Sequence, residues 1–153
     1  MNSVIIETDV KNVVDIDSDV IRNTLSRLRA IDGLLAVCVV DPDSAQVLEA
    51  VIADGDRGDG DAAVTVVAAA AGDVVQVINL MLSTLGEPDE LEDVIITLGR
   101  RHHLIVPRPQ IGADGVLVVL TLDRERTNLA RARLQVRACG PLLAPPPETG
   151  HVA

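Results

Sequence analysis

The stretch ADGDRGDGDAA at residues 53–63 is the part of the chain most suggestive of ligand chemistry. Its carboxylates could hold a calcium ion, and a calcium loop places oxygen ligands at its first, third, fifth and twelfth positions. Counted from Asp54, the fifth position is Gly58 and the twelfth is Thr65, so the spacing fails. We therefore interpret the stretch as a solvated connection that caps the next helix, and we expect no metal there.

Two other ligand chemistries fail for the same stretch. A phosphate-binding loop ends in Gly-Lys followed by Ser or Thr, whereas this chain reads Gly60-Asp61-Ala62, and carboxylates repel phosphate. The tripeptide Arg57-Gly58-Asp59 is an adhesion signal in secreted proteins, but no secretion signal follows Met1. Neither pattern therefore supports a binding loop.

The histidines, cysteines and serines form no recognisable catalytic or metal-binding pattern. His102 and His103 are adjacent, and adjacent side chains of a strand point apart, so the two cannot readily bind one metal ion. We predict that they are turn and strand-edge residues. Cys38 lies in the apolar run LLAVCVV and is predicted to be buried and inert. No nucleophile motif surrounds Ser26, Ser44 or Ser83. The sequence thus predicts no catalytic residue, no cofactor and no enzyme activity.

All but one of the 13 basic residues are arginine. Arginines of this kind could bind an anion or act as an arginine finger. We predict instead that they are surface charges whose hydrocarbon chains cover apolar parts of the surface. An arginine–anion site remains a third hypothesis, which rests only on the excess of arginine over lysine. The arginines concerned are Arg100, Arg101, Arg124, Arg126, Arg131, Arg133 and Arg137.

Eight predicted elements would position these residues. We expect one domain at residues 17–139, a flexible arm or extra strand at 1–16 and a proline-rich tail at 140–153. The fold class is predicted to be α+β, with the order α-β-β-α-β-β-β-α and a five-stranded antiparallel sheet that carries helices on its faces. Apolar periodicity, caps and turn residues place helices at 18–32, 61–85 and 128–139 and strands at 34–40, 46–53, 91–98, 103–111 and 115–122.

Two prolines restrict the fourth predicted strand. Pro107 and Pro109 have no backbone N–H, so neither can donate a ladder hydrogen bond. They are therefore expected at a strand end or on an unpaired side.

The helix predicted at 61–85 is apolar around most of its circumference. Its polar residues Thr65, Asp73, Gln76 and Ser83 are predicted to form one narrow exposed stripe that binds a partner. A helix this apolar needs burial on more than the side that its own sheet covers, which favours a homodimer over a monomeric core helix. The predicted interface residues on this helix are Val67, Ala70, Ala71, Val74, Val75 and Ile78.

Composition excludes some classes of function. The chain has 153 residues and a net charge of −10, and it contains no Phe, Trp or Tyr. Nucleic-acid binding is therefore not expected, because it depends on neutralised phosphates and aromatic stacking. Asp73 interrupts the longest apolar run, so no membrane span is expected, and a cytoplasmic location is predicted.

The element order and several sequence stretches resemble the roadblock (dynein light-chain) family over residues 20–138. The similar stretches are GLLAVCVVDPDSAQVLEAVIA, GVLVVLTLDRERTNLARARL, the Leu25/Leu28/Ile31-Asp32-Gly33 lead into the first strand, and Asn128-Leu129 at the last helix. Two features depart from the family: Ser44-Ala45 stands where its first hairpin usually has a glycine, and aromatic residues are absent.

The resemblance implies a profilin/longin-like sheet in the order 2-1-5-4-3, with the first and third helices on one face and the second on the other. It also implies dimers that pair the second helix and third strand, which adds Val94 and Ile96 to the predicted interface. Roadblock proteins are non-catalytic scaffolds and regulators of small Ras-like GTPases. The nearly lysine-free composition favours a GC-rich bacterial genome, and hence a bacterial signalling or polarity system.

A small-molecule-sensing regulatory domain is the alternative, because similar mixed sheets bind small molecules. Such a domain needs a pocket with convergent polar groups. The apolar strands offer few such groups beyond Thr97 and Thr121.

Overall fold

A computed structural model describes residues 18–53, 60–86, 90–109 and 115–138 of the chain. The predicted N-terminal arm, most of the acidic segment and the proline-rich tail lie outside these described residues. The elements follow the predicted order: helix α2 (Ser18–Leu28), strands β1 (Leu34–Val40) and β2 (Val47–Ile52), helix α3 (Gly60–Leu85), strands β3 (Val94–Thr97), β4 (Arg101–Arg108) and β5 (Val116–Asp123), and helix α4 (Leu129–Arg137).

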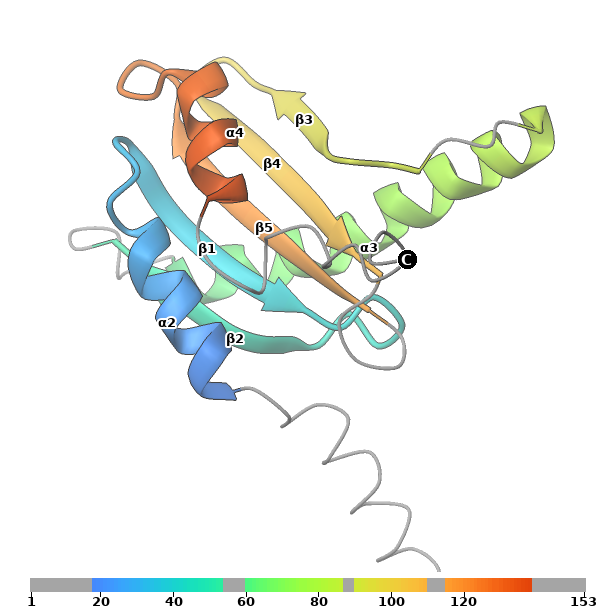
Figure 1. Ribbon diagram of the computed structural model, residues 1–153, viewed down its shortest axis with the longest axis horizontal. Coiled ribbons are helices and arrows are strands. Elements are labelled where there is room, and N and C mark those ends of the chain that lie inside the picture. The colour runs from blue at the N-terminus through green and yellow to red at the C-terminus, as the bar shows by residue number, and fades with distance from the viewer. Residues whose placement is uncertain (1–17, 54–59, 87–89, 110–114, 139–153) are drawn as a thin grey trace, which may run out of the picture.

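The five strands form one antiparallel sheet in the order β2-β1-β5-β4-β3 (Figure 1). The most apolar strands, β1 and β5, lie next to each other in the middle, where both of their faces are covered. The predicted fold class and strand order are therefore confirmed. Strands β2 and β3 are the two edges of the sheet.

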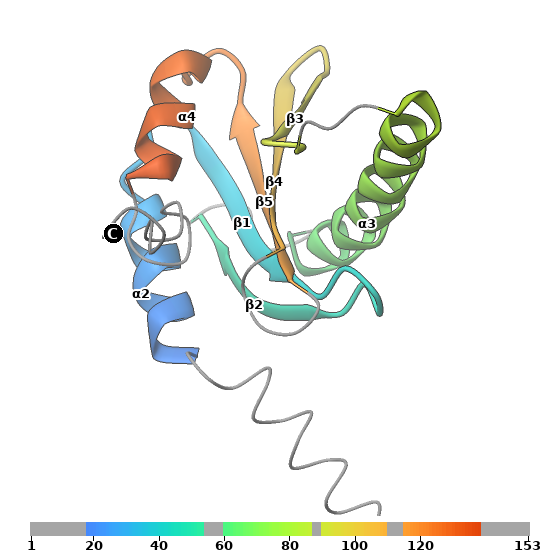
Figure 2. The ribbon, with the colours of Figure 1, turned by 45° about the vertical axis from the view of Figure 1, so that its right-hand side comes forward.

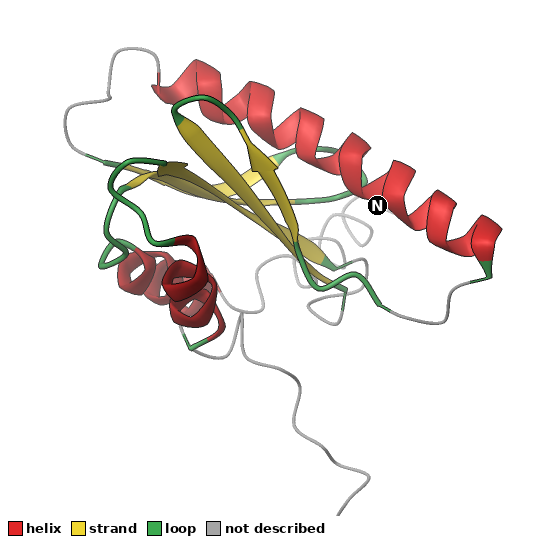
Figure 3. Ribbon diagram, turned by 90° about the horizontal axis from the view of Figure 1, so that it is seen from above, coloured by secondary structure: helices red, strands yellow, loops and turns green. Residues whose placement is uncertain are grey.

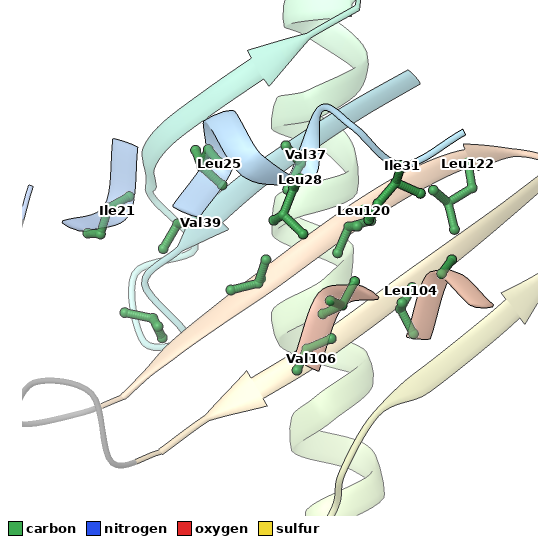
Figure 4. Packing of buried hydrophobic residues seen from close by; sticks show 14 residues of the cluster. Ile21, Leu25, Leu28, Ile31, Val37, Val39, Leu104, Val106, Leu120 and Leu122 are labelled. Carbon is green, nitrogen blue, oxygen red and sulfur yellow. The ribbon is translucent and has the colours of Figure 1, made fainter. Parts of the chain in front are cut away.

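Helices α2 and α4 cover one face of the sheet, and α3 covers the other (Figures 2 and 3). The core under α2 and α4 is aliphatic: Leu25 and Leu28 of α2 are fully buried against Val39, Leu120 and other strand residues (Figure 4). The spacing of three residues between these leucines places them on one side of the helix. Asn128 caps α4 as expected, since its side-chain oxygen accepts a hydrogen bond of 3.0 Å from the Arg131 N–H.

Helix α3 contributes the core of the opposite face. Val64, Ala68, Ala71 and Val75 are buried against side chains of β1, β4 and β5. These residues recur at intervals of three or four, so they form one stripe along the helix. That stripe accounts for only one side of α3.

Three predicted boundaries were wrong. Helix α2 ends at Leu28 rather than residue 32, because turns lead from there to Gly33, which has a φ of +84°. Strand β3 begins at Val94 rather than residue 91. Strand β4 begins at Arg101, because the preceding turn closes with a hydrogen bond of 2.8 Å from the Leu98 N–H to the Arg101 carbonyl.

The β1–β2 hairpin has an unfavourable residue at its turn. Ala45 has a φ of +59°, a left-handed conformation that is costly for a residue with a Cβ. The turn is held by hydrogen bonds of 2.9 Å from the Asp41 N–H to the Gln46 carbonyl and from the Ala45 N–H to the Asp41 carbonyl. A glycine would adopt this conformation without strain, as in the hairpins of the family that the sequence resembles.

Replacing Ala45 by Gly is therefore expected to stabilise the protein. Relief of the left-handed strain exceeds the entropy that glycine adds to the unfolded chain, which leaves a net gain of about 0.5–1 kcal/mol. Urea unfolding followed by circular dichroism measures this gain. Ala53→Gly, at a residue of ordinary φ after β2, should lower stability instead, and an equal response of the two variants would contradict the explanation.

Candidate functional site

The most unusual surface of the molecule is the side of α3 that faces away from the sheet. Of the seven large hydrophobic side chains that are exposed among the described residues, five belong to this helix. We call these five residues the outer apolar face: Val66, Val77, Leu80, Met81 and Leu85. Clustered exposed side chains of this size mark interaction surfaces far more often than scattered ones do.

The geometry of α3 explains why this face is exposed. At about 100° per residue, Val66, Val77 and Leu80 lie roughly opposite the stripe that packs on the sheet. The C-terminal end of α3 also extends past the sheet in Figures 1 and 3, and Leu80, Met81 and Leu85 belong to this end. The described part of the chain covers none of these side chains.

The structure divides the predicted interface residues of α3 into three groups. Ala71 and Val75 are 2% and 6% exposed, because the chain's own sheet buries them. Val67, Val74 and Ile78 are half-buried, and only Ala70 is exposed. The predicted interface therefore omitted all five residues of the outer apolar face, which a helical wheel phased on the sheet-facing stripe would have identified.

Strand β3 offers an unpaired edge beside this surface. It has only four residues and is paired with β4 alone, from Val94 opposite Ile105 to Thr97 opposite His102. The predicted interface residues Val94 and Ile96 are half-buried and pack against the core under α3. The backbone of such an edge strand can pair with another strand.

The four residues predicted to bind a partner are all exposed, but they do not form one stripe. Thr65, Gln76 and Ser83 lie within about 20° of one another around α3. Asp73 lies about 60–80° farther round the helix, on the same side as Val66, Val77 and Leu80. Asp73 is therefore a charged position within the outer apolar face.

Helix α3 also meets the length and composition expected of a membrane span over Val64–Leu85, with 28% of that segment buried. Asp73 alone therefore does not exclude a span by length and composition, contrary to the argument from the sequence. One such helix is weak evidence, because a helix packed on a soluble core passes the same test. The stripe that α3 buries against the sheet explains part of its apolar composition.

The other candidate residues are structural. His102 and His103 lie inside β4 rather than in a turn, and their side chains are on opposite faces of the sheet. The Nδ1 of His103 is 3.1 Å from the Oγ1 of Thr121, and burial, together with nearby Arg101, lowers its pKa. Burial raises the pKa of the Cys38 thiol to about 12, so this thiol stays protonated at neutral pH, as expected of an inert core cysteine. No group of three or more His, Cys, Asp or Glu in the described ranges could hold a metal ion.

The structure resembles solved roadblock-type structures at low sequence identity. The roadblock/LC7 domain from Streptomyces avermitilis superposes with a TM-score of 0.58 at 12% identity, covering 74% of this chain and 85% of that one. MglB from Myxococcus xanthus superposes with a TM-score of 0.55 at 13% identity, covering 84% of this chain and 88% of that one. The gliding protein MglB from Thermus thermophilus superposes with a TM-score of 0.59 at 18% identity, covering 81% of this chain and 84% of that one.

No protein-family model and no curated protein matches the chain by sequence. At such low sequence identities, this likeness establishes that the solved structures and this chain share a fold, and nothing beyond the fold. The resemblance found in the sequence is thus confirmed at the level of three-dimensional structure.

Proposed function

We propose that this chain, which has the roadblock/LC7 fold, is a non-catalytic homodimeric scaffold that binds a small Ras-like GTPase in a bacterial signalling or polarity system. The outer apolar face of α3 carries this proposal. Five exposed aliphatic side chains on one helix are costly in water, and a second copy of the same helix would cover them.

The dimer is proposed to pair α3 with α3 and β3 with β3 across a two-fold axis. The unpaired edge of β3 supports this arrangement, because two such edges can join into one continuous sheet. A solved MglB structure with a tetrameric arrangement, which has a TM-score of 0.58 to this chain, supports self-association as a property of proteins with this fold. The cytoplasm is the proposed location of the dimer.

Asp73, which the sequence also predicts to bind a partner, lies within the outer apolar face that the second copy would cover. The GTPase is therefore proposed to dock on the polar border of α3, formed by Thr65, Gln76 and Ser83. These residues are exposed in the monomer, and a two-fold axis would present them twice. Without aromatic anchors the complex is expected to be transient.

A pull-down tests this proposal. The purified protein is presented to the small GTPases of its source organism, each loaded with GDP or with a non-hydrolysable GTP analogue. Gln76→Arg is expected to weaken binding by about tenfold, because it places a bulky charge on the proposed docking border at little cost to folding. Asp19→Arg reverses an exposed charge on α2, at the other face of the sheet, and should leave binding unchanged.

Failure to capture any GTPase, in either nucleotide state, would refute the GTPase proposal. Capture that is equally weakened by Asp19→Arg would place the docking surface elsewhere. A tightly bound metabolite in the purified protein, without a GTPase partner, would favour the sensor alternative.

A further inference from the structure

A cavity of about 610 Å³ lies on the α4 side of the sheet, beside the C-terminal half of β4. Its volume is in the range of about 300–1,000 Å³ that small-molecule sites occupy. One wall is apolar and consists of Leu104 and Val106 of β4 and Val136 of α4, with Leu91 on the opposite side. Neither the proposed dimer surface nor the proposed docking border of α3 contributes to this cavity.

The cavity exists because the ladder between β3 and β4 stops early. The carbonyl of Arg101 accepts a hydrogen bond from the N–H of Leu98, so the backbone groups of Arg101 face β3. Every second residue of β4 faces the same way, which places the backbone nitrogen of Pro107 on the β3 side as well. Pro107 and Pro109 have no N–H to donate there, and the ladder ends at the pair of Val94 and Ile105. The prediction that these prolines lie on an unpaired side or at a strand end is thereby confirmed.

The segment before β3 diverges from β4 as a result. Residues 90–93 form no strand, and Figure 1 shows this segment running away from the end of β4. Two ion pairs hold it to α4 instead. Arg133 binds Asp93 in a bidentate pair of 2.8 and 3.2 Å, and the Nη2 of Arg137 donates to Glu92 at 3.0 Å. The outer wall of the cavity is therefore fixed by charge pairs rather than by strand pairing.

Arg108 is the arginine of the lining that forms no ion pair with the described part of the chain. Its Nε is buried, and the described residues provide no hydrogen bond to that atom. The carboxylates of Asp93 and Glu92 are already held by the two arginines of α4. This buried nitrogen is closed off from the cavity, but Arg108 lines the cavity with other atoms. An anion in the cavity would therefore pair with the positive charge of its guanidinium.

The neighbouring charges limit what that acceptor can be. Burial, and then the positive charge of Arg137, lower the pKa of Arg108, and an anion beside its guanidinium would offset both effects. A phosphate dianion would bring two charges close to Glu92 and Asp93, whereas a carboxylate brings one. The planar guanidinium also matches the planar carboxylate.

We propose that this cavity binds a small monocarboxylate with a hydrocarbon body. The carboxylate pairs with the guanidinium of Arg108, and the hydrocarbon lies against Leu104, Val106 and Val136. This site is independent of the dimer and of any GTPase, so its test and theirs can fail separately.

Octanoate is the probe for the test, and octanamide is its uncharged analogue. Titration of the full chain, followed by calorimetry and by thermal shift, is expected to give a Kd of about 1 mM or tighter for octanoate. Binding should raise the unfolding temperature of the protein. Octanamide is expected to bind at least about tenfold more weakly, because its neutral amide forms no ion pair with the Arg108 guanidinium.

Arg108→Gln is expected to weaken octanoate binding by about tenfold or more and to reduce the preference over octanamide to near unity. Arg126→Gln removes an exposed arginine that does not line the cavity and should bind octanoate as the wild type does. If Arg108→Gln does not fold, Arg108→Lys serves instead: it keeps the charge, loses the planar fork and should bind more weakly.

Three results would overturn the proposal. These are no octanoate binding by the wild type, equal affinity for octanoate and octanamide, and an Arg108 variant that binds octanoate as tightly as the wild type. Inorganic phosphate is titrated in parallel, and tighter binding of phosphate than of octanoate would contradict the choice of a monocarboxylate.

Discussion

Leu80→Arg is expected to convert the proposed homodimer into a folded monomer. Leu80 lies in the outer apolar face of α3 and is 67% exposed in the single chain, so the monomer tolerates a charge there. In the dimer the same position would be buried, and two arginines related by the two-fold axis would meet without partners. Burial of such charges costs several kcal/mol, which would weaken a micromolar or tighter dimer by about a thousandfold.

Analytical ultracentrifugation of the wild type and the variant at micromolar concentration measures this change, and circular dichroism establishes that the variant is folded. Leu134→Arg is the matched control, since Leu134 is equally exposed but lies on α4, at the other face of the sheet. A wild type that is monomeric at micromolar concentration would refute the dimer. Vesicle sedimentation covers the remaining possibility: a monomeric wild type that binds vesicles through Leu80 would make the outer apolar face a membrane-contacting surface.

The sequence predicts the layers of this fold well because its apolar periodicities are unambiguous. The run LLAVCVV is apolar on both faces and becomes central strand β1, and the spacing of Leu25 and Leu28 predicts the buried side of α2. The boundaries of β3 and β4 were less predictable. Residues 91–93 precede an apolar run and were included in the predicted strand, but their pairing depends on the N–H groups that Pro107 and Pro109 of a distant segment lack.

The candidate surfaces were harder to predict than the fold. Helix α3 is apolar almost all round, so its sequence alone does not show which side meets the sheet. Ala70 and Ala71 are indistinguishable by composition, yet one is exposed and the other is buried. Arg108 gave no local signal, because the role proposed for it depends on the distant arginines of α4 and on the cavity beside it.

The difference between Ala70 and Ala71 leads to a second large expected effect. The sequence predicts that arginine at either position disrupts a dimer, whereas the structure separates the two outcomes. Ala71 is 2% exposed and packs in the cluster that contains Cys38 and Val40. Close to it, a Cβ on Gly72 would lie 3.5 Å from the Pro42 carbonyl oxygen, so α3 closely approaches the β1–β2 hairpin here.

Ala71→Arg is therefore expected to destabilise the monomer itself by more than about 4 kcal/mol, because it overpacks the core and buries an unpaired charge. A domain of this size has a free energy of unfolding of about 5–15 kcal/mol, so much of its stability would be lost. Ala70→Arg, one residue away, should stay folded while dimerising more weakly. Urea unfolding followed by circular dichroism separates the two variants. If Ala71→Arg unfolded at the same urea concentration as Ala70→Arg, the side of α3 that packs on the sheet would have to be reassigned.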